Sequence, residues 1–391
     1  MNIKKDVCVI GGGLMGLSTA YYLSKAGRSV VVLEKKEIGA GASGACDDMI
    51  LLQSKKPGIA LTLAMESLEM YRGLSDELEY DLGFQSRGGT VLIEDDRQLR
   101  VMEDYVKQQQ SYGLKVDIID KKTLKTYQPH VRADIVASTY SAEDSQVDPL
   151  RMMRALVYQA GRRGVEILRG QEVTALDNKG GHWFVSTGAG ETVECDAVVN
   201  AAGAWASQIG ALVGINVPIR PRKGQLAITE QIPALGKTNV WTSSYIASKI
   251  DKSLMPDRGP YAKEIGLGFS FTQTHEGNYL IGSTREDAGY DKTTSVRAIA
   301  TIIQQAKEYF PVLNNVNIIR TIAGFRPYSA DGNSIVGPVD GLPGFFIVAG
   351  HEGDGVALTP IMGKTMADMV LGRNQDARFD QLNLRRFGKE S

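Results

Sequence analysis

The fold of this 391-residue chain is decided by the stretch VCVIGGGLMGLSTAYYLSKAGRSVVVLE, residues 7–34. A short apolar run, Val7–Ile10, leads into the glycine-rich segment Gly11–Gly16, and apolar residues then recur at helical spacing over Leu17–Ala26. A second apolar run, Val30–Leu33, ends at Glu34. The pattern predicts a strand, a glycine turn, a helix and a second strand.

The three spaced glycines of this segment have separate physical reasons. Gly11 permits a tight exit from the first strand, Gly13 lets the backbone approach a pyrophosphate, and Gly16 lets the helix lie close to the sheet. The free N–H groups at the helix N-terminus then face the phosphates. Glu34, about 20 residues further on, can accept both hydroxyl groups of an adenosine ribose and would repel a 2′-phosphate. We therefore predict a dinucleotide-binding unit.

Composition and charge argue against several classes of function. The length allows about two domains with buried cores. The net charge of -1 gives no electrostatic reason to expect nucleic acid or an anionic membrane as a partner. The cysteines lie too far apart in sequence to suggest a disulfide framework or an iron–sulfur or zinc site, and the histidines are equally scattered, so we expect no metal. These residues are Cys8, Cys46, Cys195, His130, His182, His275 and His351.

Neither a targeting segment nor a membrane span is expected. The N-terminal residues enter the nucleotide strand directly, which leaves no room for a signal peptide. Uninterrupted apolar segments stay well short of the ~20 residues that a membrane span needs. We therefore expect a protein with no integral membrane segment, located in the cytoplasm, whose reducing conditions fit the few cysteines.

Two kinds of pattern alternate along the rest of the chain. From Phe84 to Tyr140, and again from Pro221 to Arg320, strand candidates dominate and the strand–helix alternation of the opening stretch is lost. That alternation returns at Asp148-Pro149, a helix N-cap followed by proline at the first helical position. We predict an α/β fold, α+β overall, in which a Rossmann-type nucleotide domain carries an inserted, discontinuous antiparallel-sheet substrate domain. The predicted boundaries are 1–83, 146–221 and 322–391 for the first domain, and 84–145 and 222–321 for the second.

Three further stretches bring backbone with small side chains to one point. The first, Lys35–Met49, is rich in glycine and alanine, which suits a bulky planar ligand but equally suits a flexible surface loop. Within it, Asp47 and Asp48 could form an acid pair, although adjacent side chains diverge in most backbones and we expect solvated loop carboxylates. The second, Cys195–Trp205, is an apolar strand that runs into small residues. The third, Phe345–Val356, is a strand and glycine turn opening a helix whose N-terminal N–H groups would stabilise negative charge on a ligand.

Several motifs then combine in one order along the chain: Gly11–Gly16 with Glu34, Ala42–Gly44, Val199–Trp205, Gly324–Pro327 with Asp331-Gly332, and Gly350–Gly355. Together they resemble the D-amino-acid oxidase family of flavoproteins. The chain looks closest to the branch of glycine oxidase, the sarcosine and proline dehydrogenase β-subunits, the opine and D-hydroxyproline dehydrogenases and the hydrogen cyanide synthase subunit. The segment Gln273–Arg285 strengthens this placement, and the resemblance covers essentially the whole chain.

The resemblance implies FAD as the dinucleotide and assigns it a set of residues. The glycine turn would take the pyrophosphate, Glu34 and Lys35 the ribose region, Val173 the adenine, and Gly353–Val356 the pyrimidine edge of the flavin. Family members with covalent flavin attach it through a specific His or Cys, and Cys46 is not clearly at such a position, so we expect non-covalent FAD. The implied cofactor residues are Gly11, Gly13, Leu14, Met15, Gly16, Glu34, Lys35, Ala42, Ser43, Gly44, Cys46, Asp47, Asp48, Val173, Ala202, Gly203, Trp205, Gly353, Asp354, Gly355, Val356 and Ala357.

The resemblance also implies substrate residues. Arg326 matches the family's substrate arginine, whose planar fork can hold a carboxylate with two charge-assisted hydrogen bonds; an ordinary interdomain ion pair is the alternative. Tyr245, Tyr261 and Tyr279 are candidates for a second hydrogen bond to the substrate, although most tyrosines are packing residues. His351 is a candidate base, but we expect it to shape the glycine turn around it.

The implied activity is dehydrogenation of the C–N bond of a small amino acid or secondary amine by hydride transfer to flavin N5. Glycine, sarcosine, proline, hydroxyproline, D-amino acids and opines are the substrates to consider. Glycine oxidase has a basic residue in the last glycine turn, where this chain has Glu352 and Asp354. This difference favours a dehydrogenase catalytic subunit with electron-accepting partner subunits in a hetero-oligomer. A stand-alone oxidase that makes H2O2 and a non-catalytic FAD-binding protein are the alternatives.

Overall fold

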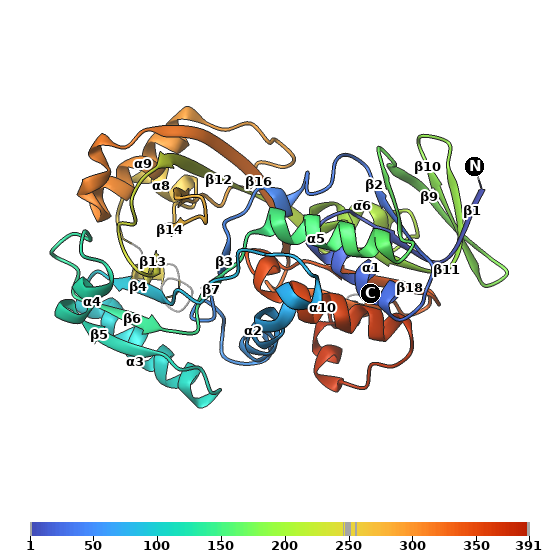
Figure 1. Cartoon of the computed structure of the whole chain (residues 1–391), viewed down its shortest axis with the longest axis horizontal. Coiled ribbons are helices and arrows are strands. Elements are labelled where there is room, and N and C mark those ends of the chain that lie inside the picture. Colours follow the sequence, from blue (N-terminus) through green and yellow to red (C-terminus); the bar gives the residue numbers. More distant parts are fainter. Residues whose placement is uncertain (1, 245, 247–251, 255, 389–391) are drawn as a thin grey trace.

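The computed structural model describes residues 2–244, 246, 252–254 and 256–388. It has a mixed α/β fold built on two eight-stranded sheets, which lie at opposite ends of the long axis of the molecule (Figure 1). The sheet that begins with β1 lies at the right of that view, and the sheet that contains β4 lies at the left.

The first sheet is mainly parallel. Its strands are, in order across the sheet, β17 (Ile335–Pro338), β18 (Phe345–Ala349), β11 (Thr192–Asn200), β1 (Asn2–Ile10), β2 (Val30–Glu34) and β8 (Glu166–Arg169), with β10 (His182–Thr187) pairing β11 and β9 (Val173–Lys179) pairing β10. The five strands from β18 to β8 run parallel, while β17 is an antiparallel edge. Val9 pairs with Val32 and with Val199, so the apolar run of the opening stretch forms the centre of the sheet.

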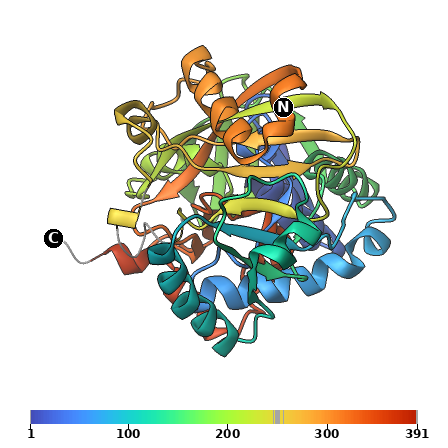
Figure 2. The same ribbon diagram turned by 90° about the vertical axis from the view of Figure 1, so that its left-hand side faces the viewer.

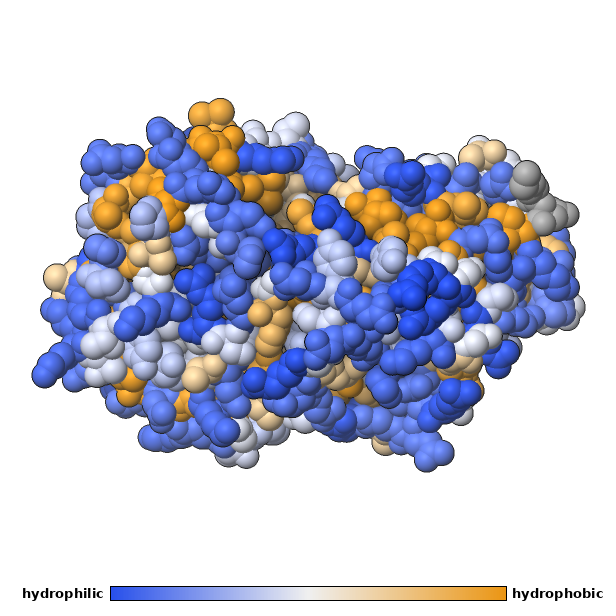
Figure 3. Space-filling view, viewed as in Figure 1, coloured by the Kyte–Doolittle hydropathy of each residue, from blue (hydrophilic) through white to orange (hydrophobic). Residues whose placement is uncertain are grey.

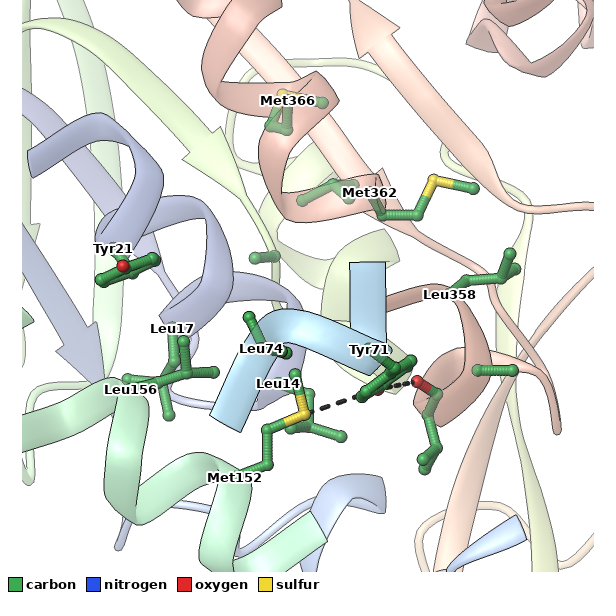
Figure 4. Packing of buried hydrophobic residues seen from close by; sticks show 14 of the residues in the cluster. Leu14, Leu17, Tyr21, Tyr71, Leu74, Met152, Leu156, Leu358, Met362 and Met366 are labelled. Atoms are coloured by element: carbon green, nitrogen blue, oxygen red, sulfur yellow. Dashed lines mark hydrogen bonds between the residues drawn. The ribbon is translucent and has the colours of Figure 1, made fainter. Parts of the chain in front are cut away.

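Four helices cover the first sheet and form its core. They are α1 (Leu14–Lys25), α2 (Ile59–Glu77), α5 (Pro149–Arg162) and α10 (Gly355–Val370). The predicted N-cap of α5 is confirmed, because the Asp148 carboxylate accepts hydrogen bonds from the backbone N–H groups of Leu150 and Arg151. Figure 4 shows Tyr71 of α2 between α5 and α10, where its hydroxyl donates to the Val356 carbonyl at 2.5 Å. This hydrogen bond ties the first turn of α10 to the buried core.

The second sheet is mainly antiparallel. Its strands are, in order, β16 (Ile318–Ser329), β12 (Ile219–Gln231), β15 (Asn278–Gly282), β14 (Ser270–Gln273), β13 (Asn239–Thr242), β4 (Gly89–Ile93), β6 (Ala137–Ser141) and β5 (Asp117–Asp120). Helices α3 (Asp96–Ser111), α4 (Lys121–Tyr127), α8 (Pro260–Glu264) and α9 (Val296–Tyr309) accompany it. Figure 2 shows α9, in orange, above the strands and α3, in teal, below them. The sequence of β4 explains the two covered faces, since Leu92 packs in the cluster of α9 and its neighbours Val91 and Ile93 pack in the cluster of α3.

The remaining elements are short. They are β3 (Met49–Ile50), β7 (Ser145–Gln146), α6 (Ala206–Ala211) and the 3₁₀ helices η1 (Ala42–Gly44), η2 (Gly203–Trp205), η3 (Lys252–Leu254), η4 (Pro311–Asn315), η5 (Ala377–Leu382) and η6 (Leu384–Phe387). The predicted domain boundaries near residues 221 and 321 fall inside β12 and β16, which pair continuously from Ile219 opposite Ser329 to Ile228 opposite Arg320. The α/β fold class is confirmed, while the exact domain boundaries stay a prediction.

The surface on one face of the molecule is mostly hydrophilic, with hydrophobic patches among the charged residues (Figure 3). Exposed apolar side chains such as Val296 and Ile319 contribute to the surface, as they do on most globular proteins. Within the described part of the chain, every helix is too short or too polar to cross a bilayer.

Candidate active site

A cavity of about 470 Å³ is lined by residues of both sheets. The first sheet contributes the ends of β1, β2 and β18, where parallel strands deliver their carboxyl ends to one edge. The second sheet contributes β12, β13, β14 and β16 through residues such as Leu226, Trp241 and Ser270. The volume lies in the range of small-molecule and cofactor sites.

The glycine turn after β1 forms one end of the cavity. Gly11 has a φ of +115°, and a side chain there would meet the Ala201 carbonyl oxygen at 2.5 Å. A side chain on Gly13 would meet the Ser43 hydroxyl oxygen at 3.0 Å. Glycine at these two positions therefore lets the turn lie close to the neighbouring segments.

The carboxylate of Glu34 is fixed beside this turn. One of its oxygens accepts from the Gly12 N–H and the other from the Lys36 N–H, both at 2.8 Å. Next to it, the Lys35 ammonium lies 4.2 Å from the centre of the Trp205 ring, a cation–π contact at the cavity wall. The end of β2 thus presents a held carboxylate and an aromatic surface to the cavity.

Two helix N-termini open into the same cavity. The N-cap residue of α1 is Gly13, which has no side chain. The N-cap residue of α10 is Asp354, whose side chain makes no hydrogen bond to the helix N-terminus. The residues that follow each cap, Leu14 and Met15 in α1 and Gly355 and Val356 in α10, line the cavity. In α1 the Leu14 N–H already donates to the Ser43 hydroxyl at 3.0 Å. The N–H groups that follow it, and those at the start of α10, are placed to stabilise negative charge on a ligand.

Arg326 of β16 lies on the part of the lining contributed by the second sheet. Its guanidinium donates to the Thr284 carbonyl at 2.8 Å and to the Ser283 hydroxyl at 3.0 Å. On the neighbouring strand β12, a side chain on Gly224 would lie 2.8 Å from the Arg326 Cζ atom, so glycine leaves the room that the fork occupies. The two hydrogen bonds hold the planar guanidinium at the cavity, in the space that Gly224 leaves open.

Other charged groups of the lining are paired with each other. The ammonium of Lys55, a buried residue, lies 2.6 Å from Asp354 at the start of α10. Glu352 lies 3.7 Å from Arg222 and 3.9 Å from Arg285. The final glycine turn therefore carries two carboxylates, each facing cations that come from distant parts of the chain.

The two adjacent aspartates do not share one environment. Asp48 is buried, and burial together with the neighbouring Asp47 carboxylate raises its pKa to about 7. The expectation of a solvated carboxylate is therefore wrong for Asp48, because β3 carries the residue into the core. Asp47 is half-buried and lines the cavity; burial raises its pKa, while the Arg326 guanidinium acts in the opposite direction.

Cys46 and His351 both keep their neutral forms. Burial raises the pKa of the Cys46 thiol well above its usual range, so it stays protonated. Burial lowers the pKa of His351 to about 4, and its Nε2 atom has no hydrogen-bond partner among the described residues. A neutral imidazole therefore lies at the cavity wall behind the glycine turn.

Comparison with known proteins identifies this arrangement. Residues 6–369 match the family described as FAD dependent oxidoreductase (DAO). The chain belongs to this family. Its predicted membership and the predicted cofactor, FAD, are thereby confirmed, as is the prediction of an FAD-dependent oxidoreductase.

Three relatives illustrate the breadth of the DAO family around this chain. The hydrogen cyanide synthase subunit HcnC of Pseudomonas aeruginosa is 29% identical, over 95% of this chain and 93% of that protein. Glycine oxidase of Geobacillus kaustophilus is 26% identical, over 97% of this chain and 96% of that protein. The crystal structure of L-proline dehydrogenase from P. horikoshii superposes with a TM-score of 0.87 and 25% identity, over 99% of this chain and 98% of that one.

The residues of the cavity fit FAD. The dinucleotide carries negative charge on its pyrophosphate, and two helix N-termini face the cavity. Glu34 is held where the end of β2 meets the glycine turn, as a ribose-binding carboxylate requires. A side chain on Gly11 would collide with the Ala201 carbonyl oxygen, so glycine lets the turn pack tightly against the neighbouring segment.

Most of the predicted site residues line this one cavity. They are Gly11, Gly13, Leu14, Met15, Glu34, Lys35, Ala42, Ser43, Cys46, Asp47, Val173, Ala202, Gly203, Trp205, Arg326, Gly353, Asp354, Gly355 and Val356. Four predicted cofactor residues lie behind or beside the lining: Gly16, Gly44, Asp48 and Ala357. Tyr245 lies outside the described residues.

Two predicted substrate tyrosines lie away from the cavity. Tyr279 is 3% exposed, its ring stacks on Phe271, and its hydroxyl accepts from the Leu235 N–H at 2.7 Å. Tyr261 packs against the same core and lies under the Arg297 guanidinium, 3.7 Å from the ring centre. Both side chains serve the packing of the second sheet and α9, which corrects their prediction as substrate contacts.

Several cavity residues carry no local signal in the sequence. Lys55, Trp241 and Arg285 line the cavity from three separate segments, and Gly224 lies in a strand that resembles any other. Only the pairing of β12 with β16 and with β15 shows that Gly224, Ser283 and Arg326 meet.

Proposed function

We propose that this FAD-dependent oxidoreductase dehydrogenates the C–N bond of a small amino acid or secondary amine. The observation that carries the proposal is the fork of Arg326, held at the cavity by Thr284 and Ser283. A planar guanidinium in this setting matches the carboxylate of an amino acid with two parallel hydrogen bonds. The names of the relatives, a hydrogen cyanide synthase subunit, a glycine oxidase and an L-proline dehydrogenase, support the same substrate class.

The proposed roles divide the cavity into two parts. At one part, the turn Gly11–Gly16 and the N-terminus of α1 hold the pyrophosphate, and Glu34 holds the ribose. At the other, Arg326 orients the substrate by its carboxylate, and the N-terminus of α10 stabilises negative charge. The chemistry that bound FAD supplies is acceptance of a hydride from the α-carbon of a neutral amine, which leaves an imine for water to hydrolyse.

The electron acceptor separates two candidate functions. We favour a dehydrogenase catalytic subunit that passes electrons to partner subunits, since the last glycine turn carries Glu352 and Asp354 and one relative is named as a subunit. A stand-alone oxidase is the second candidate, because a glycine oxidase aligns along nearly the whole chain. We expect the substrate to be one of the small amino acids, secondary amines or opines.

An anaerobic titration tests the proposal. The purified holoprotein is mixed without oxygen with glycine, sarcosine, L- and D-proline, hydroxyproline isomers, D-alanine and an opine, and the visible flavin absorbance is followed. Bleaching by at least one compound supports the proposed activity, and bleaching by none of them contradicts it. Air is then readmitted: rapid return of colour indicates an oxidase, and slow return indicates a dehydrogenase subunit.

A further inference from the structure

We propose that Asp47 receives the amine of the substrate: its carboxylate holds the substrate ammonium group beside Arg326 and accepts one proton from it. The inference rests on the proposed function, since it names the second half of the same substrate site. It also narrows the substrate class to compounds that carry an ammonium group and a carboxylate on one carbon.

The backbone brings Asp47 and Arg326 to the same part of the cavity. A side chain on Gly324 of β16 would meet the Ala45 Cβ atom at 2.8 Å and its carbonyl oxygen at 2.9 Å, so the loop packs directly on the strand. Asp47 lies two residues beyond Ala45, and Arg326 lies two residues beyond Gly324. Both side chains line the cavity. A cation and an anion thus face one volume, as the two charged groups of an amino acid require.

The other carboxylates of the described lining have evident tasks. Glu34 accepts two backbone N–H groups near the glycine turn, Asp354 pairs with Lys55, and Glu352 lies between Arg222 and Arg285. Glu172 lies next to Val173, and its negative charge attracts the Lys35 ammonium at the end of the cavity assigned to the nucleotide. Asp47 is therefore the acid placed to meet a substrate amine on the Arg326 side.

The charges around Asp47 set how readily it takes a proton. Arg326, Arg285 and Lys55 are the cations that act on it, Asp48 is the neighbouring acid, and Cys46 is a neutral thiol. Burial raises the pKa of Asp47, while the three cations act in the opposite direction and favour its carboxylate form. A carboxylate in this balance can both attract an ammonium group and accept its proton.

The proton transfer is balanced without a further reactant. One N–H bond of the ammonium group breaks, one O–H bond forms on Asp47, and the nitrogen keeps the electron pair. The substrate amine becomes neutral, which is the form that can release a hydride from the adjacent carbon. No atom is oxidised in this step.

Two matched ligands test the inference without turnover. 2-Aminoisobutyrate and 2-hydroxyisobutyrate have the same shape, differ in an ammonium group against a hydroxyl, and have no hydrogen on the α-carbon, so neither can be oxidised there. We expect calorimetry on the holoprotein to show a preference of at least tenfold for the amino ligand. Asp47→Asn, which has nearly the same shape, loses that preference, whereas the control Asp117→Asn, which changes an exposed acid of β5, keeps it.

The pH dependence of anaerobic flavin reduction is the second measurement. With the panel compound that bleaches fastest, Asp47→Asn shifts the profile toward the pKa of the free amine and lowers the rate at pH 7 at least tenfold, because each pKa unit is a factor of ten in the neutral amine. The inference is overturned if Asp47→Asn changes neither ligand preference nor pH profile while the wild type is bleached. If no panel compound bleaches the wild type and neither isobutyrate binds, the proposed function fails and the inference falls with it.

Discussion

A single methyl group on Gly224 provides a sharp test of how Arg326 works. Gly224 lies on β12 next to β16, and a Cβ atom there would sit 2.8 Å from Arg326 Cζ and 2.9 Å from its Nη2. Ordinary contact begins at 3.4 Å, so Cζ must retreat by about 0.6 Å, and Nη1, the guanidinium atom nearest to the new Cβ, must retreat further. Gly224→Ala therefore displaces the fork and leaves its charge in place.

The expected effect is a loss of substrate positioning. A shift of 0.6 Å along the bond to Thr284 stretches it from 2.8 to 3.4 Å, beyond the usual range of an N–H···O bond. Misplacement of about 1 Å can cost roughly 100-fold, so a loss of roughly 10- to 100-fold in kcat/KM is expected, or about 1.4–2.7 kcal/mol. Most of it is expected in KM, because the carboxylate contact is present in both ground and transition states.

The assay is anaerobic stopped-flow reduction of the flavin at a series of substrate concentrations. The matched control is Gly73→Ala in α2, where a Cβ atom meets nothing within 4 Å. The control should keep kcat/KM and gain up to about 1 kcal/mol of stability from alanine in a helix. If Gly224→Ala stays folded with bound FAD and keeps kcat/KM within a factor of three, the position of the Arg326 fork is not what orients the substrate.

Three further predictions concern stability and the cofactor. Asp354→Asn should lower the free energy of unfolding in urea by about 3–5 kcal/mol, because the buried Lys55 ammonium loses the carboxylate 2.6 Å away, whereas Lys55→Met should cost less, roughly 1–2 kcal/mol, because water reaches Asp354; equal losses would contradict the asymmetry. The pKa of Asp48 is raised to about 7 in the folded state. Protonated Asp48 therefore contributes fully to the free energy of unfolding below about pH 4, and this contribution is lost as the pH rises through 7. Asp48→Asn should therefore be more stable than the wild type at pH 8, by roughly 1–3 kcal/mol, with the gain shrinking at pH 5; a gain independent of pH would refute the assignment. Glu34→Ala should weaken FAD binding roughly 10- to 100-fold in a fluorescence titration, through loss of charged hydrogen bonds, and unchanged affinity would exclude its ribose role.

The nucleotide part of the site could be predicted because its reasons are local. The turn Gly11–Gly16 and the acid Glu34 lie within one strand–helix–strand unit, so sequence spacing alone places them. The N-cap of α5 at Asp148 was predictable for the same reason, since a cap and its helix are neighbours in sequence. Arg326 needed the family resemblance, because a lone arginine in a strand has many possible tasks.

The substrate part could not be predicted in the same way because its residues meet only after strands pair. Lys55 reaches Asp354 across nearly 300 positions of sequence, and Gly224 makes room for Arg326 from another strand. Tyr279 shows a different error: its hydroxyl made it a candidate for a second hydrogen bond to the substrate, but strand alternation turns its ring into the core against Phe271. Asp48 was assigned to solvent because adjacent side chains usually diverge in a loop, and the strand β3 that follows it, Met49–Ile50, is too short to leave a sequence pattern.

The central claim, that Arg326 orients an amino acid for oxidation at this cavity, is tested most directly by Arg326→Gln under single-turnover conditions. The wild type and the variant, both with FAD bound, are mixed anaerobically with the panel compound that bleaches the wild type fastest, and dithionite confirms that both flavins can be reduced. The claim predicts that reduction of the variant slows roughly 100-fold or more at subsaturating substrate, because a bidentate charge-assisted contact is lost. Reduction of the variant at the wild-type rate would contradict it.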